Sequence, residues 1–180
     1  MILNSETTIY LNNGSYFNFL EPDESVFSIY DIANALSKCG RFSNQGDNFY
    51  SVAEHSVYVS HLVPEEDAME ALMHDASEFV MNDVATPLKR LLPEYKRIEE
   101  KVEESIFKRF GLRYPFPPSV KIADKQAFYA EKEQVINNFD DMEYLQGIEK
   151  PKITLMFYDH MRAKTFFLNR YFELKRKAAA

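Results

Sequence analysis

The sequence predicts a mostly α-helical protein, a helical bundle with one small β-hairpin near its N-terminus. Apolar residues recur at helical spacing along most of the chain, the strand-like segments are confined to the first 21 residues, and no linker divides the 180 residues. We therefore expect a single domain over residues 1–180, in which residues 1–21 form a hairpin extension and residues 26–176 form the helical body.

The hairpin is predicted from two short segments rich in β-branched and aromatic residues, Thr7–Leu11 and Ser15–Leu20. Between them lies Asn12–Asn13–Gly14, and an Asn-Gly step supplies the positive φ angles of a tight turn. An isolated hairpin is only marginally stable in water, so we expect this one to lie against the helical body.

Helix boundaries are predicted from local signals. Ser51 and Glu54 have the spacing of a capping box, Pro64 precedes two acidic residues that suit the positive end of a helix, and Gly111 follows a long amphipathic stretch. The predicted helices are residues 28–38, a helix that begins at about Val52, residues 64–81, a short turn at 88–92, and residues 95–110, 119–137 and 152–175.

Composition narrows the function. The formal charge of −7 argues against binding to nucleic-acid polymers, which requires a basic face. Cys39 is the single cysteine, so no intramolecular disulfide can form, as is usual in a reducing compartment. The sequence has no apolar run of membrane-spanning length and no signal peptide at residues 1–6, so we expect a cytoplasmic protein that does not bind membranes.

The most informative stretch is Ala71–Glu78, in which His74 and Asp75 are adjacent within a predicted helix. Neighbouring helical residues point about 100° apart, so the two side chains can approach one ion from the helix edge, and Glu78 follows one turn after Asp75. His55 and Asp124 come from two other predicted helices and complete a candidate ligand set.

Two imidazoles and two carboxylates suit a divalent transition ion such as Mn²⁺, Co²⁺, Fe²⁺, Ni²⁺ or Zn²⁺. An octahedral ion with these four ligands would keep two open positions, for a water molecule and a phosphate oxygen. A second Mg²⁺ or Mn²⁺ could enter with the phosphates of a substrate.

The order His…His-Asp…Asp resembles that of the HD-domain metal-dependent phosphohydrolases. Over about residues 41–135 the chain is similar to bacterial 5′-deoxynucleotidases and to phage-type enzymes that remove triphosphate from dATP or related dNTPs. The segments that carry the resemblance are Arg41–Phe42, Ala53–Ser56, His74–Glu78 and Asp83–Lys89.

The resemblance implies a role for each candidate residue. The implied metal ligands are His55, His74, Asp75 and Asp124. The implied catalytic residues are Glu78, which would orient water or protonate the leaving oxygen, and Asp83, a second acid of the nucleotidase site. The implied substrate contacts are Arg41, Phe42, Lys89 and Lys121. Phe42 stands where these families usually carry a Trp near the sugar, which leaves sugar discrimination open.

The expected activity is hydrolysis of deoxynucleotides (EC 3.1), with a metal-activated water attacking phosphorus. Because Lys89 and Lys121 would neutralise a polyphosphate, we expect a dATP-like dNTP triphosphohydrolase that releases triphosphate. The alternatives are a 5′-deoxynucleotidase that acts on dNMPs and a non-catalytic nucleotide-sensing module; a phosphodiesterase of a signalling nucleotide is less well supported, because the two remaining histidines are poorly placed. The resemblance also implies a homo-oligomer.

Each candidate residue also has an ordinary structural explanation. His55 could be a core histidine, Glu78 a surface residue, Asp83 a cap for the turn at Thr86–Pro87, and Lys89 a surface cation. His61 is six residues after His55 and off its helical face, so we expect it to be surface or packing.

Overall fold

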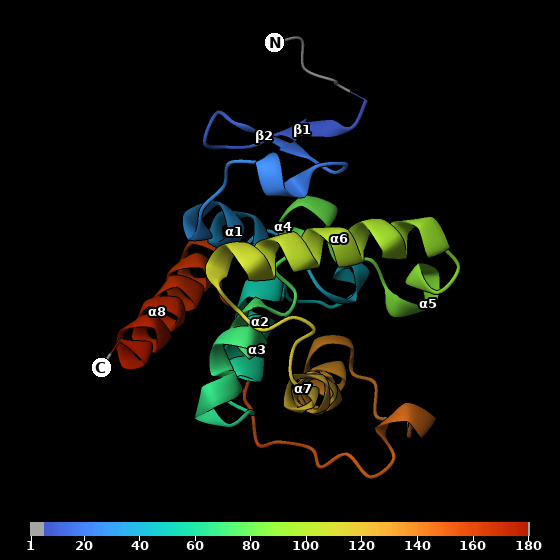
Figure 1. Ribbon diagram of the computed structural model, residues 1–180. Helices are drawn as coiled ribbons and strands as arrows, with labels where there is room; N and C mark the ends of the chain where they lie inside the picture. Colours follow the sequence, from blue (N-terminus) through green and yellow to red (C-terminus); the bar gives the residue numbers. More distant parts are fainter. Residues whose placement is uncertain (1–5, 180) are drawn as a thin grey trace.

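A computed structural model of the chain describes residues 6–179 (Figure 1). Its main elements are β1 (Thr8–Tyr10), β2 (Tyr16–Asn18), α1 (Ile29–Leu36), α2 (Val52–Ser60), α3 (Ala68–Met73), α4 (Glu78–Met81), α5 (Thr86–Lys89), α6 (Pro93–Phe110), α7 (Pro118–Ile136) and α8 (His160–Ala178). The predicted class, mostly α with a small N-terminal hairpin, is confirmed. Within the described residues, no helix has both the length and the apolar character needed to cross a membrane.

Helix α2 lies at the centre of the bundle, in contact with α1, α3, α7 and α8 (Figure 1). The main apolar core includes one fully buried side chain from each of five helices: Ile32, Val57, Leu72, Ile106 and Phe167. Because α2 is covered on several sides, eight of its nine residues are buried, including polar ones. A polar side chain on α2 must therefore find its partners within the protein.

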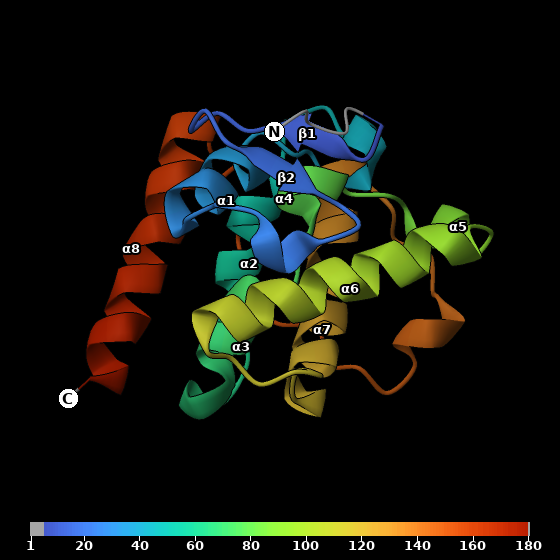
Figure 2. The ribbon, with the colours of Figure 1, turned by 45° about the horizontal axis from the view of Figure 1, so that its top comes forward.

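The hairpin lies against the helical body as predicted (Figure 2). Its strands are antiparallel, with Ile9 opposite Phe17. The fully buried ring of Phe17 packs edge-on against Phe79 of α4, with the ring centroids 5.5 Å apart. In the turn only Gly14 has a positive φ, +85°, so the expectation of several positive φ angles at the Asn-Gly step is corrected to one.

The predicted continuous helix over residues 64–81 is wrong. α3 ends at Met73 and α4 begins at Glu78, so His74 and Asp75 lie in the turn between them. The backbone N–H groups of Ala76, Glu78 and Phe79 each donate to the carbonyl three residues earlier, which tightens the chain relative to an α-helix. This tighter turn changes the direction in which the side chain of Asp75 leaves the backbone.

The last helix was predicted to begin at Lys152, but α8 begins at His160, with Asp159 as its N-cap. The carboxylate of Glu54 on α2 accepts hydrogen bonds from the backbone N–H groups of Met156, Phe157 and Tyr158, at 2.8–3.2 Å. These N–H groups are held in a non-helical segment by a partner about 100 residues earlier in the chain. Sequence periodicity contains no signal for such a contact.

Replacing Glu54 is expected to destabilise the protein. Glu54→Ala leaves three backbone N–H groups without their acceptor, and we expect the free energy of unfolding to fall by about 3 kcal/mol. Urea denaturation measures this change, with Glu66→Ala at an exposed position as the control. Limited proteolysis should also cut the Glu54→Ala protein between residues 150 and 159 faster than the wild type. Equal stability of the two variants would contradict this role for Glu54.

Candidate metal centre

The residues of the proposed ligand set come from three parts of the fold. His55 lies in the middle of α2, His74 and Asp75 lie in the turn between α3 and α4, and Asp124 lies on the second turn of α7. Both α3 and α7 pack directly on α2, which brings these segments to one point. His55 is fully buried and His74 nearly so, while the side chain of Asp124 is 43% exposed, so the cluster opens to solvent on the side of α7.

The potential ligand atoms lie close together. The Nε2 atom of His55 is 3.3 Å from Nε2 of His74 and 3.3 Å from Oδ1 of Asp124. Oδ2 of Asp75 lies 3.4 Å from Nε2 of His55 and 3.2 Å from Nε2 of His74. Ligand atoms of His55, His74 and Asp124 all lie within 4.8 Å of one another.

This donor set fits a divalent cation. Ligand bonds of about 2.1 Å put neighbouring ligand atoms ~3 Å apart, close to the observed separations. The second nitrogen of each imidazole is already engaged: Nδ1 of His55 lies 2.6 Å from Oε1 of Glu131, and Nδ1 of His74 lies 2.8 Å from the Ala71 carbonyl oxygen. Since carboxylates and carbonyls accept, both Nδ1 atoms carry a proton, and this leaves both Nε2 atoms free to coordinate a cation at the centre once they are deprotonated.

Glu131 was not identified from the sequence. It lies on α7 seven residues after Asp124, on the same face of the helix, and its side chain is 1% exposed. Besides His55, its carboxylate accepts a hydrogen bond of 2.8 Å from the Tyr50 hydroxyl and lies 3.2 Å from the Arg41 guanidinium. The sequence did contain one indication of its role, because Glu131 is an acidic residue two helical turns after the proposed ligand Asp124.

Arg41 contacts both Glu131 and the proposed ligand Asp75. Its Nη1 atom lies 3.4 Å from Oδ2 of Asp75, while its Nη2 atom lies 3.2 Å from Oε2 of Glu131. Burial opposes ionisation of Glu131, but His55 and Arg41 hold the pKa of its carboxyl below the usual value. Burial likewise opposes ionisation of Asp75, yet its contacts with His74 and His55 hold its pKa well below the usual value. Both carboxylates are therefore charged, as metal coordination and its support require.

Glu78 has the opposite character. It is 5% exposed, so the surface explanation for this residue is excluded, and its Oε2 has no hydrogen-bond partner among the described residues. Burial, and then the carboxylates of Asp75 and Asp83, raise its pKa well above the usual value. Burial also raises the pKa of Asp83. A carboxyl group whose protonated form is favoured by its surroundings is suited to act as a general acid.

The other residues predicted for the site differ in burial and in the groups that they contact. Lys89 is half-buried, with its ammonium 2.6 Å from Oε1 of Glu99 and 3.8 Å from Oε1 of Glu78. Lys121 is exposed, with its ammonium 5.9 Å from the ring centroid of Phe116. The N-cap of α5 is Ala85 and receives no side-chain hydrogen bond, which removes the capping explanation for Asp83. His61 is exposed at the end of α2, as expected.

Comparison with known proteins agrees with this geometry. A family model described as "5′-deoxynucleotidase YfbR-like" matches residues 46–145, more than half of the chain. The chain belongs to the YfbR-like 5′-deoxynucleotidase family. The match includes the four proposed ligands together with Glu78 and Glu131, while Arg41 and Phe42 precede it. The resemblance to HD-domain phosphohydrolases is thus confirmed at the level of the family.

Two relatives are similar over longer stretches. The uncharacterized protein YfdR of Escherichia coli (strain K12) is 41% identical over 145 residues, which cover 81% of this chain and 80% of YfdR. The uncharacterized protein RCAP_rcc00048 of Rhodobacter capsulatus is 34% identical over 125 residues, 64% of each chain. Neither name states an activity, so the YfbR-like family itself is the source of functional information.

Glu131→Gln is expected to weaken metal binding while it preserves the fold. Gln keeps the shape of the side chain but removes the charge that orients His55, and loss of such an outer partner typically lowers metal affinity by about 10–100-fold. Titration of the metal-free protein with Co²⁺ or Zn²⁺ against a chromophoric chelator measures the affinity. Glu133→Gln, on the same helix but paired with Lys150, is the control and should bind metal as the wild type does. Equal affinity of the two variants would show that Glu131 does not support the centre.

Proposed function

We propose that this protein is a metal-dependent phosphohydrolase that removes phosphate from 5′-deoxynucleotides. The observation that carries the proposal is the convergence of two imidazoles and two carboxylates, with their outer partners in place, beside a buried carboxyl group of raised pKa. Membership of the YfbR-like family supports the same reaction class.

In this proposal His55, His74, Asp75 and Asp124 hold the cation. When bound, the cation polarises a phosphate oxygen and activates a water molecule as the nucleophile. The guanidinium of Arg41, fixed between Asp75 and Glu131, lies at the edge of the site where it can contact a phosphate oxygen.

Glu78 then donates a proton to the 5′-oxygen of the departing nucleoside, because burial and the carboxylates of Asp75 and Asp83 raise its pKa and so favour its protonated form.

The charges around the centre favour a monophosphate substrate over a triphosphate. The charged carboxylates of Asp75 and Asp124 lie at the centre, and a triphosphate brings more negative charge toward them than a monophosphate does. Of the two lysines that favoured a triphosphate in the sequence, Lys89 is paired with Glu99 and Lys121 lies beside Phe116. We therefore place the 5′-deoxynucleotidase first, reversing the order expected from the sequence.

The dNTP triphosphohydrolase stays the second candidate because the Lys89 ammonium also lies 3.8 Å from Glu78. A substrate phosphate at this position could draw Lys89 away from Glu99. A second Mg²⁺ or Mn²⁺ bound with the phosphates would serve the same candidate, since it would offset the acidic lining.

The test is a panel of dNMPs, dNTPs and ribonucleotides incubated with Mn²⁺ or Co²⁺, with products identified by phosphorus NMR. We expect orthophosphate from dNMPs and little release from dNTPs. Inorganic triphosphate from a dNTP would instead support the second candidate. Tight nucleotide binding without any product, at full metal occupancy, would support the non-catalytic sensor and refute both enzymatic versions.

We infer that the hairpin and the helical body act as one domain, since Phe17 packs against both Phe27 and Phe79. We also expect a homo-oligomer, which sedimentation analysis would test.

A further inference from the structure

Three aromatic side chains form a continuous row beside the metal centre. The ring of Phe42 stacks on that of Phe128, with centroids 5.6 Å apart and planes inclined by 23°. The ring of Tyr144 continues the row, with its centroid 5.5 Å from that of Phe128. We call Phe42, Phe128 and Tyr144 the aromatic row.

Two members of the row, Phe128 and Phe42, lie close in the chain to the proposed metal ligands and phosphate contact. Phe128 lies on α7 four residues after Asp124 and three before Glu131, so these three side chains share one face of the helix. Phe42 directly follows Arg41, whose guanidinium carbon lies 5.8 Å from the Phe42 ring centroid. Phe42, at one end of the row, is therefore next to Arg41, the proposed phosphate contact.

The aromatic row is not part of the closed interior. Tyr144 is 47% exposed, and Phe42 and Phe128 are only half-buried, whereas Phe17, Phe107 and Phe167 in the core are at most 1% exposed. Burial, and then the carboxylate of Asp124, raise the pKa of the Tyr144 phenol to about 12, which agrees with its position near the centre. Partly exposed aromatic side chains beside a polar site can offer a surface to a flat ligand.

The backbone at Phe42 is held in an uncommon conformation. Phe42, Ser43 and Asn44 have consecutive positive φ angles of 55°, 52° and 56°. A bulky non-glycine residue rarely adopts such an angle, because it costs free energy that the surrounding contacts must offset. This geometry places the Phe42 ring against Phe128.

We propose that the aromatic row is the surface on which the nucleobase of a substrate deoxynucleotide stacks. The inference rests on the proposed function, because it assumes that the 5′-phosphate occupies the metal centre. In a 5′-nucleotide the base is one sugar ring away from the phosphate, so a phosphate at Arg41 and Asp124 directs the base toward Phe42 and Tyr144. Stacking tolerates every base because each has a π-face, so the row predicts broad base acceptance.

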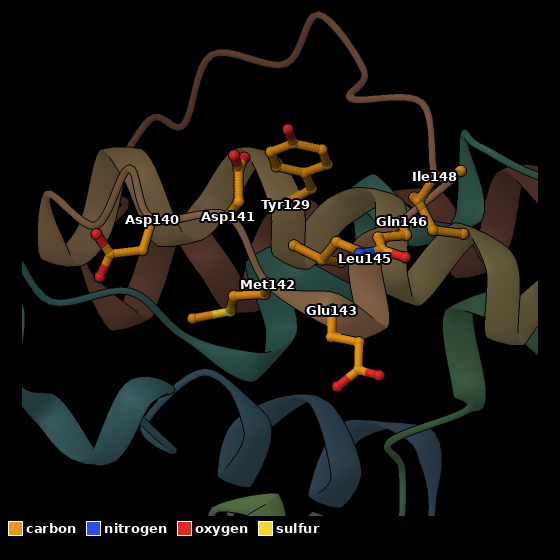
Figure 3. Close-up of a pocket in the computed structure, with 9 residues that line it drawn as sticks. Tyr129, Asp140, Asp141, Met142, Glu143, Leu145, Gln146 and Ile148 are labelled. Atoms are coloured by element: carbon orange, nitrogen blue, oxygen red, sulfur yellow. The ribbon is translucent and has the colours of Figure 1, made fainter.

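A hollow of about 530 Å³ lies between Tyr129 of α7 and the loop over residues 140–148 (Figure 3). Its lining includes Asp140, Asp141 and Glu143, and none of the four proposed ligands. Three carboxylates are unfavourable for an anionic nucleotide. Tyr129 is therefore a suitable control, since it is an aromatic residue on the same helix as Phe128 but outside the row.

The experiment compares Tyr144→Leu, Tyr144→Phe and Tyr129→Leu. Leu keeps apolar volume but removes the π-face, so Tyr144→Leu should raise KM for dAMP and TMP about tenfold. KM for 2-deoxyribose 5-phosphate, which has no base, should change less than twofold. Tyr144→Phe retains the ring and should restore binding of both nucleotides, and Tyr129→Leu should behave as the wild type.

A second measurement separates this inference from the proposed function. Saturation-transfer NMR on Zn²⁺-loaded Glu78→Gln protein, in which turnover is expected to be slow, detects contacts of dAMP base protons, and adding Tyr144→Leu should reduce this signal. Base contacts in a wild-type protein that hydrolyses no nucleotide would refute the proposed function and leave the stacking surface supported. An active enzyme whose Tyr144→Leu variant binds dAMP normally, or loses dAMP and the abasic phosphate equally, would overturn the stacking surface and leave the function supported.

Discussion

Asp75→Ala is expected to yield a folded protein that no longer retains a divalent cation and hydrolyses no nucleotide. Oδ2 of Asp75 lies within 3.4 Å of both imidazole Nε2 atoms and of the Arg41 guanidinium, so its removal takes away a ligand and a charge partner together. Metal affinity should fall by more than the roughly 10–100-fold that loss of an outer partner causes. Plasma spectroscopy after dialysis measures the metal content, and a coupled phosphate assay measures turnover.

The matched control for this substitution is Asp23→Ala. Asp23 is exposed and pairs with Lys108 at the surface, where ion pairs contribute little to stability. The Asp23→Ala protein should keep wild-type metal content and activity. An Asp75→Ala protein that lacks metal yet remains active would disprove a metal-dependent reaction, and one that keeps its metal would remove Asp75 from the ligand set.

Glu78→Gln is expected to separate chemistry from metal binding. Gln fills the same buried space but has no carboxyl proton to donate, so kcat should fall by about 10²–10⁴-fold, the usual contribution of a general acid. Metal content should remain that of the wild type, and KM should change little. Steady-state kinetics with dNMPs tests this, with Glu100→Gln on the exposed face of α6 as the control. An unchanged kcat in the Glu78→Gln protein would show that Glu78 is not the general acid.

The Glu78→Gln protein should be more stable than the wild type, by an amount that increases with pH. Because burial and the neighbouring Asp75 and Asp83 raise the pKa of Glu78 in the folded protein, the folded state binds its proton more tightly than the unfolded state does. The wild-type protein therefore loses stability relative to Glu78→Gln as pH rises above about 4.3, the ordinary glutamate value. Urea denaturation of both metal-free proteins at pH 5 and pH 8 should show the larger difference at pH 8. A difference that shrinks toward pH 8 would contradict a raised pKa.

Local patterns were sufficient for much of the fold. The long helix α6 ends at Phe110, and Gly111 follows with a φ of +68°, as its position after the amphipathic stretch predicted. α2 begins at Val52, and the side chain of Ser51 accepts a hydrogen bond from the backbone N–H of Glu54. These boundaries depend on residues within one or two turns of each other, which sequence reading can evaluate directly.

Two helix boundaries were predicted wrongly, for different reasons. α8 begins eight residues later than expected because Glu54 holds the preceding N–H groups. The helix predicted over residues 64–81 is interrupted where His74 and Asp75 face the centre. Before α8 a tertiary partner takes the backbone N–H groups, whereas after Met73 the N–H groups bond to carbonyls three residues earlier and Nδ1 of His74 lies 2.8 Å from the Ala71 carbonyl oxygen; helix periodicity registers neither arrangement.

By itself, the sequence determined the family, the mostly helical class and the types of ligand in the proposed metal set, because these depend on residue identity, spacing and order. Only the tertiary structure decided how those ligands are supported and what surrounds them. The contacts of Glu131 with His55, Arg41 and Tyr50, the pairing of Lys89 with Glu99, and the aromatic row all join residues that are far apart in the chain or come from different elements. Such contacts arise from the packing of helices around α2, and packing is a property of the whole chain.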